Sequence, residues 1–342
     1  MRKIDIFTHV YPRNFYDRLM SVAGQFKDVG KRSRGVPMLA DLDERFRVMD
    51  RYEGYQQVLS LPTPPIEAMV DDRGQALDLA RTANDGMAEL VARHPDRFPT
   101  FAAAVPLNDP DASVREVHRA VDELGARGFQ MFSNVRGKPI SDPEFLPLFE
   151  AAAAYDLPIW LHPYRGADPP DYKSEAHSQF EIWWTFGWPY ETSVAMARVV
   201  FAGYFDRWPN LKIIAHHMGA MAPFFAGRLG PGWDQLGART SDEDLSVHLK
   251  RLRKRPIDYF RMFYGDTALF GAYDATVCGL GFFGVDHVLF ASDAPFDPEK
   301  GPMYIRETIA IIDRLPISDD ERERIYWRNA ATLLKLYLTP GH

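Results

Sequence analysis

Histidine or aspartate follows a short apolar segment at four places in the sequence. His9 and His162 each end one segment, and the pair His216-His217 ends a third. Asp293 ends the fourth. A catalytic zinc ion is held by a few histidine and carboxylate ligands, with one coordination position left open for water or substrate. A lone histidine is more often structural, but four such endings are hard to attribute to chance. They predict a divalent-metal site.

The alternation of side chains along a strand separates His217 from His216. Successive residues of a strand face opposite sides. If His217 points into a barrel, Ala215 does too, while His216 faces the surrounding helices. By the same alternation Asp293 shares its face with Ala291. We therefore expect His217 and Asp293 to transfer protons in the site, and His216 to have a structural role.

Phe7 lies two residues before His9 and shares its inward face. A phenyl ring has no lone pair, so this position cannot bind a metal. We expect Phe7 to shape the pocket beside the metal; the other interpretation is that it fills the barrel core, because inward positions of barrels are packed. His9, His162 and Asp293 remain as three protein ligands, which suffice for many catalytic zinc sites. His217 is expected to approach as a fourth.

Short apolar segments alternate with helical patterns along the chain. This alternation predicts a parallel sheet with helical connections, and eight such units would close a (β/α)8 TIM barrel. An open, doubly wound sheet is the alternative. Helices are predicted over residues 111–124, with Asp111 as N-cap, and over 144–155. Strands are expected at residues 4–10, 56–61, 100–105, 128–133, 158–162, 212–217, 262–265 and 287–292.

Three connections are too long to be simple turns, namely residues 11–42, 163–189 and 218–260. Each would leave the carboxyl end of a strand, the face where barrels hold their sites. Segment 163–189 is rich in aromatic residues and is predicted to form a lid or pocket wall, or else a hydrophobic cluster under a long loop. His177 lies in this segment, and we expect it to contact substrate because functional residues favour loops.

The composition bounds the class of protein. Of the 342 residues 46% are hydrophobic, which is ample for a large core, and the net charge of −7 argues against a nucleic-acid partner. Cys278 is the one cysteine, so no disulfide forms within the chain. No apolar run approaches the length of a membrane span. We expect a soluble, cytoplasmic protein with no membrane partner, folded as a single domain over residues 1–342.

Four longer stretches carry a resemblance to a known family. They read NVRGKPISDPEFLPLFEAAAAYDLPIWLHP (134–163), GWPYETSVAMARVVFAGYFDRWPNLKIIAHHMG (187–219), HVLFASDAPF (287–296) and RNAATLLK (328–335). The chain resembles, over nearly its whole length, the aminocarboxymuconate-semialdehyde decarboxylase-like branch of the amidohydrolase superfamily, also called amidohydrolase-related or amidohydrolase-2. The resemblance implies a barrel with one divalent metal ion at the strand ends, zinc in the first place and manganese as the alternative. His9, His162 and Asp293 match the metal ligands, and His217 matches the catalytic histidine.

The same resemblance implies roles for residues on loops. Trp184 looks like a pocket tryptophan. Arg228 looks like an arginine that reaches the substrate carboxylate of a neighbouring subunit, which implies a homodimer or a larger homo-oligomer. Relatives carry His or Glu where this chain has Phe7. Arg165, close after His162, is a candidate for binding a substrate carboxylate because a guanidinium pairs with it bidentately; it is equally a candidate loop anchor.

Together these features predict non-oxidative decarboxylation of a small aromatic or unsaturated carboxylic acid. An aromatic pocket wall and nearby arginines favour a flat, anionic substrate. The alternative is metal-dependent hydrolysis of a small cyclic ester or amide, in which the metal makes hydroxide and Asp293 or His217 handles the proton. A third hypothesis is a degenerate barrel that binds a small molecule without turnover.

Overall fold

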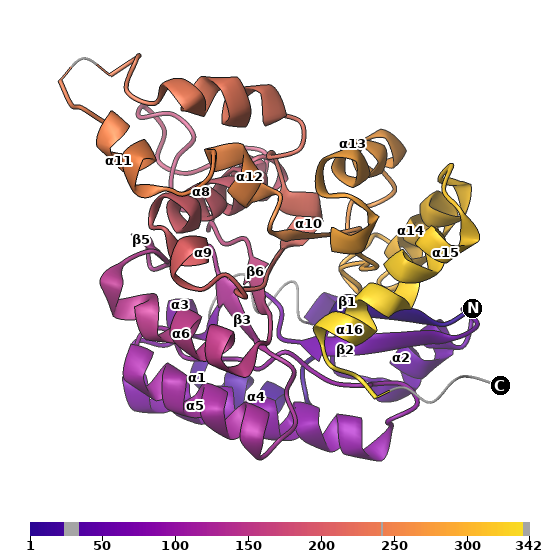
Figure 1. Cartoon of the computed structure of the whole chain (residues 1–342). Coiled ribbons are helices and arrows are strands. Elements are labelled where there is room, and N and C mark those ends of the chain that lie inside the picture. Colours follow the sequence, from indigo (N-terminus) through magenta and orange to yellow (C-terminus); the bar gives the residue numbers. More distant parts are fainter. Residues whose placement is uncertain (24–33, 241, 338–342) are drawn as a thin grey trace.

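Parallel strands form the centre of the computed structural model, which describes residues 1–23, 34–240 and 242–337 (Figure 1). Strand β1 pairs with β2, and a second sheet has the order β3-β6-β7-β8-β9. Strands β4 and β5 form a small antiparallel hairpin. The strand bounds are β1 Lys3–His9, β2 Tyr55–Ser60, β3 Phe129–Phe132, β4 Asn134–Val135, β5 Lys138–Pro139, β6 Ile159–His162, β7 Ile213–Ala215, β8 Tyr264–Asp266 and β9 Val288–Leu289.

Single pairs of residues connect the two parallel sheets into a ring. Three isolated parallel bridges do so: Leu59 with Phe101, Ala103 with Phe129, and Thr8 with Ala294. The last bridge joins the segment after β9 to β1, and the hydrogen bond from Asp293 N to Phe7 O, at 3.1 Å, joins the same two segments. This is the strand order of the predicted (β/α)8 barrel, and it excludes the open, doubly wound sheet.

The strand predicted at residues 100–105 is wrong in extent, because only Phe101 and Ala103 form bridges there. An asparagine side chain ends the pairing. Asn84 donates to the backbone oxygen of Ala104 at 2.9 Å and accepts from its N–H at 2.8 Å. The backbone groups that a neighbouring strand would bind are thus satisfied by a helix side chain.

Apolar side chains pack against the strands in two layers, one inside the barrel and one outside it. The inner layer fills the barrel and takes residues from successive strands: Ile4, Ile6, Val58, Ala102, Trp160, Ile214, Leu289 and Ala291. Trp160 is fully buried and donates its indole N–H to Ile6 O at 2.9 Å. The larger outer layer packs between strands and helices. Strands buried on both sides are typical of parallel sheets, and they place the site at the rim, where packed layers end.

Helices cover the outside of the strands, and Figure 1 shows α4 and α5 at the opposite end of the molecule from α11 and α12. Asp109 is the N-cap of helix α5, and its side chain accepts from Ala112 N at 2.9 Å, so the prediction of Asp111 as N-cap is wrong. Pro110 takes the first helical position, where no N–H is needed. The helix bounds are α1 Arg13–Ala23, α2 Leu42–Met49, α3 Ile66–Met69, α4 Arg73–Arg93, α5 Pro110–Asp122, α6 Leu146–Tyr155, α7 Ile182–Thr185, α8 Gly187–Phe201, α9 Tyr204–Arg207, α10 His216–Gly219, α11 Ser246–Arg251, α12 Pro256–Phe260, α13 Tyr273–Phe283, α14 Pro302–Arg314, α15 Asp319–Glu323 and α16 Asn329–Leu333.

The long connections leave the carboxyl ends of β1, β6 and β7, as predicted. Residues 24–33 of the first connection lie outside the described residues. The second connection contains α7 and leads into α8, and the third contains α11 and α12. Within the described ranges, no helix is both long and apolar enough to cross a membrane.

Candidate metal centre

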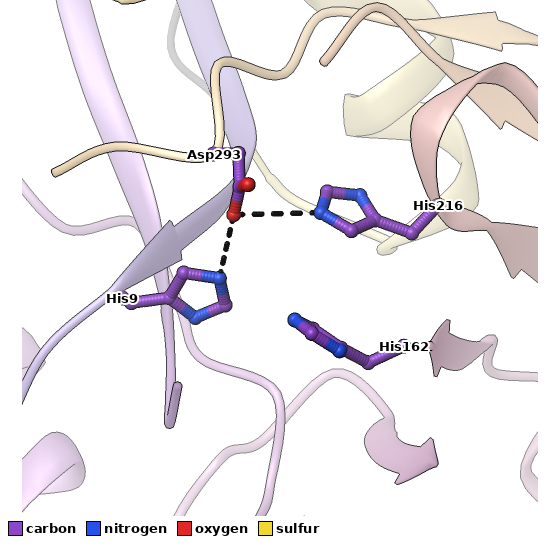
Figure 2. Close-up of side chains that lie close together, drawn as sticks. All are labelled: His9, His162, His216 and Asp293. Carbon is purple, nitrogen blue, oxygen red and sulfur yellow. Dashed lines mark hydrogen bonds and ion pairs between the residues drawn. The ribbon is translucent and has the colours of Figure 1, made fainter. Parts of the chain in front are cut away.

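Four buried side chains converge at the carboxyl end of the barrel strands (Figure 2). His9 ends β1 and His162 ends β6. His216 follows β7 directly, and Asp293 follows β9. Each side chain offers one ligand atom, and the four atoms all lie within 4.8 Å of one another. Figure 2 shows the side chains reaching toward a common centre from separate strands, which is an arrangement that suits one metal ion.

Local backbone structure fixes the direction of His9. Arg45, on α2, is fully buried and donates to the backbone oxygen of His9. Just before this point the pairing of β1 with β2 shifts register. The extra residue of such a bulge re-aims the side chains that follow, and Ile6 and Phe7 both belong to the inner layer. The barrel therefore orients His9 through its backbone, independently of any ligand.

The prediction that His216 faces the helices is wrong. In β7 it is Ile214 that belongs to the inner layer, whereas Ile213 and Ala215 pack outward. Alternation therefore carries His216 into the barrel mouth, where it joins the cluster. His217 lies beyond the strand in the left-handed region, with φ 55° and ψ 53°, so strand alternation does not govern its direction.

His217 lies beside the cluster rather than within it. Its Nε2 is 3.5 Å from Asp293 Oδ2, and its backbone N–H donates to Asp266 Oδ1 at 3.1 Å. The His217 side chain is 11% exposed, whereas the side chains of His9 and His216 are at most 1% exposed. His217 is thus placed to meet a molecule that enters the barrel mouth. Its catalytic role stays a prediction.

The contact between His9 and Asp293 tests whether the cluster fits a metal. His9 Nδ1 lies 3.1 Å from Leu61 O, and a carbonyl oxygen accepts only, so Nδ1 carries the hydrogen. Ser60 Oγ, also 3.1 Å from Nδ1, donates its own hydrogen to Thr8 O and can only accept from the ring. The lone pair of a neutral His9 Nε2 then faces Asp293 Oδ1 at 2.8 Å. Two acceptors this close need a proton or a metal ion between them, and the donor set suits a divalent metal.

Burial and mutual contact shift the pKa values of the four clustered groups. Burial holds the pKa of His9 below its usual value and that of His162 well below. For His216 burial acts in the same direction, but the carboxylates of Asp266 and Asp293 outweigh it and raise the pKa to about 9. Burial alone would raise the pKa of Asp293, yet its contacts with His216, His217 and His9 hold it well below its usual range. An ionised carboxylate and neutral imidazoles are the forms that bind metals. Asp293, His9 and His162 are thus held in the binding form, whereas His216 has to release a proton when it binds.

Phe7 forms the apolar wall of the cluster. It is fully buried, and its ring centroid lies 5.3 Å from that of His9 and 5.6 Å from that of His162. The Phe7 ring stacks on His216 at 3.7 Å with an interplanar angle of 19°. Phe7 therefore packs against the three imidazoles and keeps water away from them, but it supplies no ligand atom.

Arg165 and Trp184 lie on the connection after β6. Arg165 donates to Pro170 O at 3.2 Å and lies 3.5 Å from the Asp171 carboxylate, contacts that tie down its own loop. Trp184 is partly exposed, donates to Glu181 at 2.9 Å, and has its ring 6.4 Å from that of Trp188. Neither side chain is in the buried cluster, and their predicted contacts with substrate stay predictions.

His177 and Arg228 are exposed and do not belong to the buried cluster. His177 is exposed on the loop between β6 and α7. Arg228 is exposed at the start of a π-helical turn, Arg228–Gly232, with its guanidinium carbon 5.6 Å from the centre of the Phe225 ring. Each is available to a ligand or to a second chain, and the fold does not bring either into the group of four buried donors.

Sequence reasoning missed three residues that shape the site. His216 was assigned to the wrong face. Asp266 ends β8, as the other polar residues end their strands, and that shared position is a signal that could have found it. Trp188 is buried with its ring 5.7 Å from that of His162, and it donates to Arg165 O at 3.1 Å. Among several tryptophans in one segment, sequence alone does not mark the one that packs on the cluster.

Comparison with known proteins gives the class to which this barrel belongs. The amidohydrolase family model matches residues 4–336. The chain therefore belongs to the amidohydrolase family, as its motifs predicted.

Individual relatives share most of their length with this chain. A gamma-resorcylate decarboxylase of Polaromonas sp. strain JS666 is 31% identical, over 94% of this chain and 95% of the relative. A 2-amino-3-carboxymuconate-6-semialdehyde decarboxylase of Dictyostelium discoideum is 28% identical, over 98% and 92%. A crystal structure of the dihydroxybenzoic acid decarboxylase from Polaromonas sp. JS666, with bound manganese and the inhibitor 2-nitroresorcinol, superposes with a TM-score of 0.78 at 29% identity, covering 99% of this chain and 98% of that one.

Proposed function

We propose that this chain is a metal-dependent decarboxylase, one catalytic domain over residues 1–342, that removes CO2 from a small aromatic or unsaturated carboxylic acid. The observation that carries the proposal is the buried group of three imidazoles and one carboxylate at the barrel mouth. The similarity to decarboxylases over nearly the full chain supports the reaction type.

His9, His162 and Asp293 are the proposed metal ligands. Imidazole and carboxylate donors suit zinc, which we propose as the resident ion. Manganese is the alternative, because the Polaromonas enzyme holds it. Each histidine has an acceptor for its other ring nitrogen: Leu61 O lies 3.1 Å from His9 Nδ1, and Pro163 O lies 2.6 Å from His162 Nδ1. Such partners fix the ring and its tautomer for metal binding.

The reaction breaks the bond between a ring or vinyl carbon and the carboxylate carbon. The electron pair stays on the ring or vinyl carbon, CO2 leaves, and a proton takes its place. When bound, the metal supplies positive charge that holds and polarises the substrate oxygens. We assign the proton transfer to His217, whose partly exposed ring is next to Asp293, and the orientation of that ring to Asp293 at 3.5 Å.

The substrate is proposed to enter over the apolar wall made by Phe7. Trp184 is assigned to the outer pocket, since the chain of rings from Trp184 through Trp188 ends at His162. Arg165 and Arg228 are the proposed partners of the substrate carboxylate, and His177 is a further proposed contact from the loop. Trp184, Arg165, Arg228 and His177 all lie on segments that leave strand carboxyl ends.

The test is CO2 release from a panel of hydroxybenzoates and unsaturated carboxylic acids by protein of known metal content. We expect turnover that a chelator abolishes and that zinc or manganese restores. Acid release from lactones, cyclic esters or amides, without CO2 from any acid, would replace the decarboxylase by a hydrolase. Tight binding of an aromatic acid with neither product would indicate a barrel that binds without turnover.

We infer that the chain forms a homodimer through an aromatic face, defined by the exposed rings of Phe186, Tyr190 and Phe224 and by an apolar groove beside Arg228. These rings are 70%, 54% and 79% exposed, and the groove lies between α8 and residues 221–233. Large exposed apolar areas are typical of interaction sites, and two-fold dimers are the commonest oligomers.

Sedimentation at working concentration tests the dimer. Mixing Arg228→Ala subunits with His217→Ala subunits tests whether Arg228 serves the neighbouring site, because a mixed dimer then regains one intact site. A fully active monomer would remove Arg228 from the substrate contacts.

A further inference from the structure

His216 is held in the manner of a metal ligand. Its side chain is completely buried, and its Nδ1 lies 2.5 Å from Asp266 Oδ2, which is also completely buried. Within the described part of the chain, His216 Nε2 has no hydrogen-bond partner, although it lies 3.5 Å from Asp293 Oδ1. A buried ring nitrogen without a hydrogen bond is costly, and a metal ion at the centre of the cluster would give this atom a close partner.

The three imidazoles of the cluster share one pattern. In each, Nδ1 faces an oxygen: Leu61 O for His9, Pro163 O for His162, and the Asp266 carboxylate for His216. This leaves every Nε2 directed at the common centre with Asp293 (Figure 2). Histidines that bind metals almost always donate their other ring N–H to a carboxylate or carbonyl in this way.

Phe7 completes the arrangement from the opposite side. Its ring stacks on that of His216, which hinders any rotation that would turn the imidazole out of its plane. His216 is therefore fixed by Asp266 through one edge and by Phe7 over one face. A lone buried histidine kept only for packing would not require both an anionic partner and an unpaired nitrogen.

We propose that His216 is a fourth protein ligand of the metal, oriented by Asp266 and packed on Phe7. This inference rests on the proposed metal centre and adds to it a donor from β7. The site then has three imidazoles and one carboxylate, while His217 stays free of the metal for its contact with substrate. Asp266 acts as a positioning residue, since it holds His216 and does not reach the centre of the cluster.

Metal affinity, measured by competition of the metal-free protein with a chromophoric chelator for zinc and for manganese, separates the two neighbouring histidines. We expect His216→Ala to weaken binding by at least about 100-fold and Asp266→Asn by about 10- to 100-fold, the range found for partners of metal-bound histidines. His217→Ala is the matched control and should bind metal within about threefold of wild type, because no imidazole of the cluster donates its Nδ1 hydrogen to His217, and so His217 orients none of them. Equal affinity in wild type and His216→Ala would overturn the inference.

Two further measurements keep the test decisive if His216→Ala is unstable. X-ray absorption of the zinc-loaded wild type should show scattering from three imidazoles, and a signal from two would overturn the inference. In the double variant Phe7→His/His216→Ala, an imidazole is returned beside the vacated position, since the Phe7 and His216 rings are in contact. We expect this double variant to bind metal at least tenfold more tightly than His216→Ala, whereas Phe7→Leu/His216→Ala should show no such gain.

These results are independent of the reaction. A wild type that binds metal through three imidazoles but releases no CO2 from any acid would overturn the proposed function and leave His216 as a ligand. A wild type that decarboxylates while His216→Ala retains full metal affinity would do the reverse.

Discussion

Two regions at the mouth of this barrel carry chemistry-bearing side chains, and they are built in opposite ways. In the buried cluster, His9 and His162 end strands β1 and β6, and Asp293 follows β9 on a segment whose backbone is hydrogen-bonded to β1. On the aromatic face, Phe186 and Phe224 are 70% and 79% exposed on segments that follow the strands. The cluster is complete within one chain, whereas the aromatic face needs a partner to become buried.

This difference teaches where a single chain determines its own site. Strand ends are positioned by the ladder and by the packed layers beneath them, so their side chains converge before a ligand arrives. Side chains on the connections, such as Trp184 and Arg228, take their final contacts from whatever covers them. Substitutions in the two regions should therefore differ in both size and kind.

The largest effect is expected at His162. Replacing it by Ala removes one of the proposed ligands from a fully buried position, so the protein should lose its bound metal and all measurable decarboxylation. Metal content by mass spectrometry and CO2 release give the two readouts. His118→Ala, an exposed histidine on α5 that contacts Tyr155, is the matched control and should retain both. Retained metal in His162→Ala would exclude this residue from the site.

A large effect without metal loss is expected at His217. His217→Ala should lower kcat by about 10²–10⁴-fold, the usual contribution of a general acid, because the proposed proton donor is removed. Metal content should be unchanged, since His217 lies beside the cluster. Steady-state kinetics at matched metal occupancy provide the test, and a variant that keeps its kcat would assign the proton transfer elsewhere.

A smaller gain is expected from Phe7→His. A fifth donor beside His9 should tighten metal binding by about tenfold, on the scale of ligand-shell changes, and it should lower activity by taking a coordination position meant for a substrate oxygen. Chelator competition measures the affinity. Phe7→Leu, which adds no donor, serves as the control. A weaker metal site in Phe7→His would show that stacking on His216 matters more than the number of donors.

The smallest effect on the cluster is expected from the aromatic face. Phe224→Asp places a charge on an exposed ring position, so we expect dissociation of the dimer while metal content stays at the wild-type level. Sedimentation velocity and metal analysis test the two parts. Val277→Asp is the control, because Val277 is a 42% exposed apolar residue on α13, outside this face. Loss of metal in Phe224→Asp would mean that the two regions are coupled.

The sequence by itself predicted parallel strands with helical connections and most of the polar residues at the strand ends, and the bridges between strands then decided for the barrel over the open sheet. Alternating strands and helices predicted the (β/α)8 order, and polar residues at the ends of apolar segments marked His9, His162 and Asp293. This worked because parallel strands of a barrel all end at the same face, so position along the chain converts directly into position in the site. The same rule could have marked Asp266 at the end of β8.

The tertiary structure alone decided between His216 and His217. The residues before them, Ile213, Ile214 and Ala215, are all apolar, because a strand of a parallel barrel is buried on both sides. Such a strand carries no polar residue to show which side faces the barrel. Alternation therefore assigns the residues to two faces, but it does not tell which face points inward. The packing of Ile214 into the inner layer shows which face points inward. It places His216 in the cluster and leaves His217 on the turn that follows.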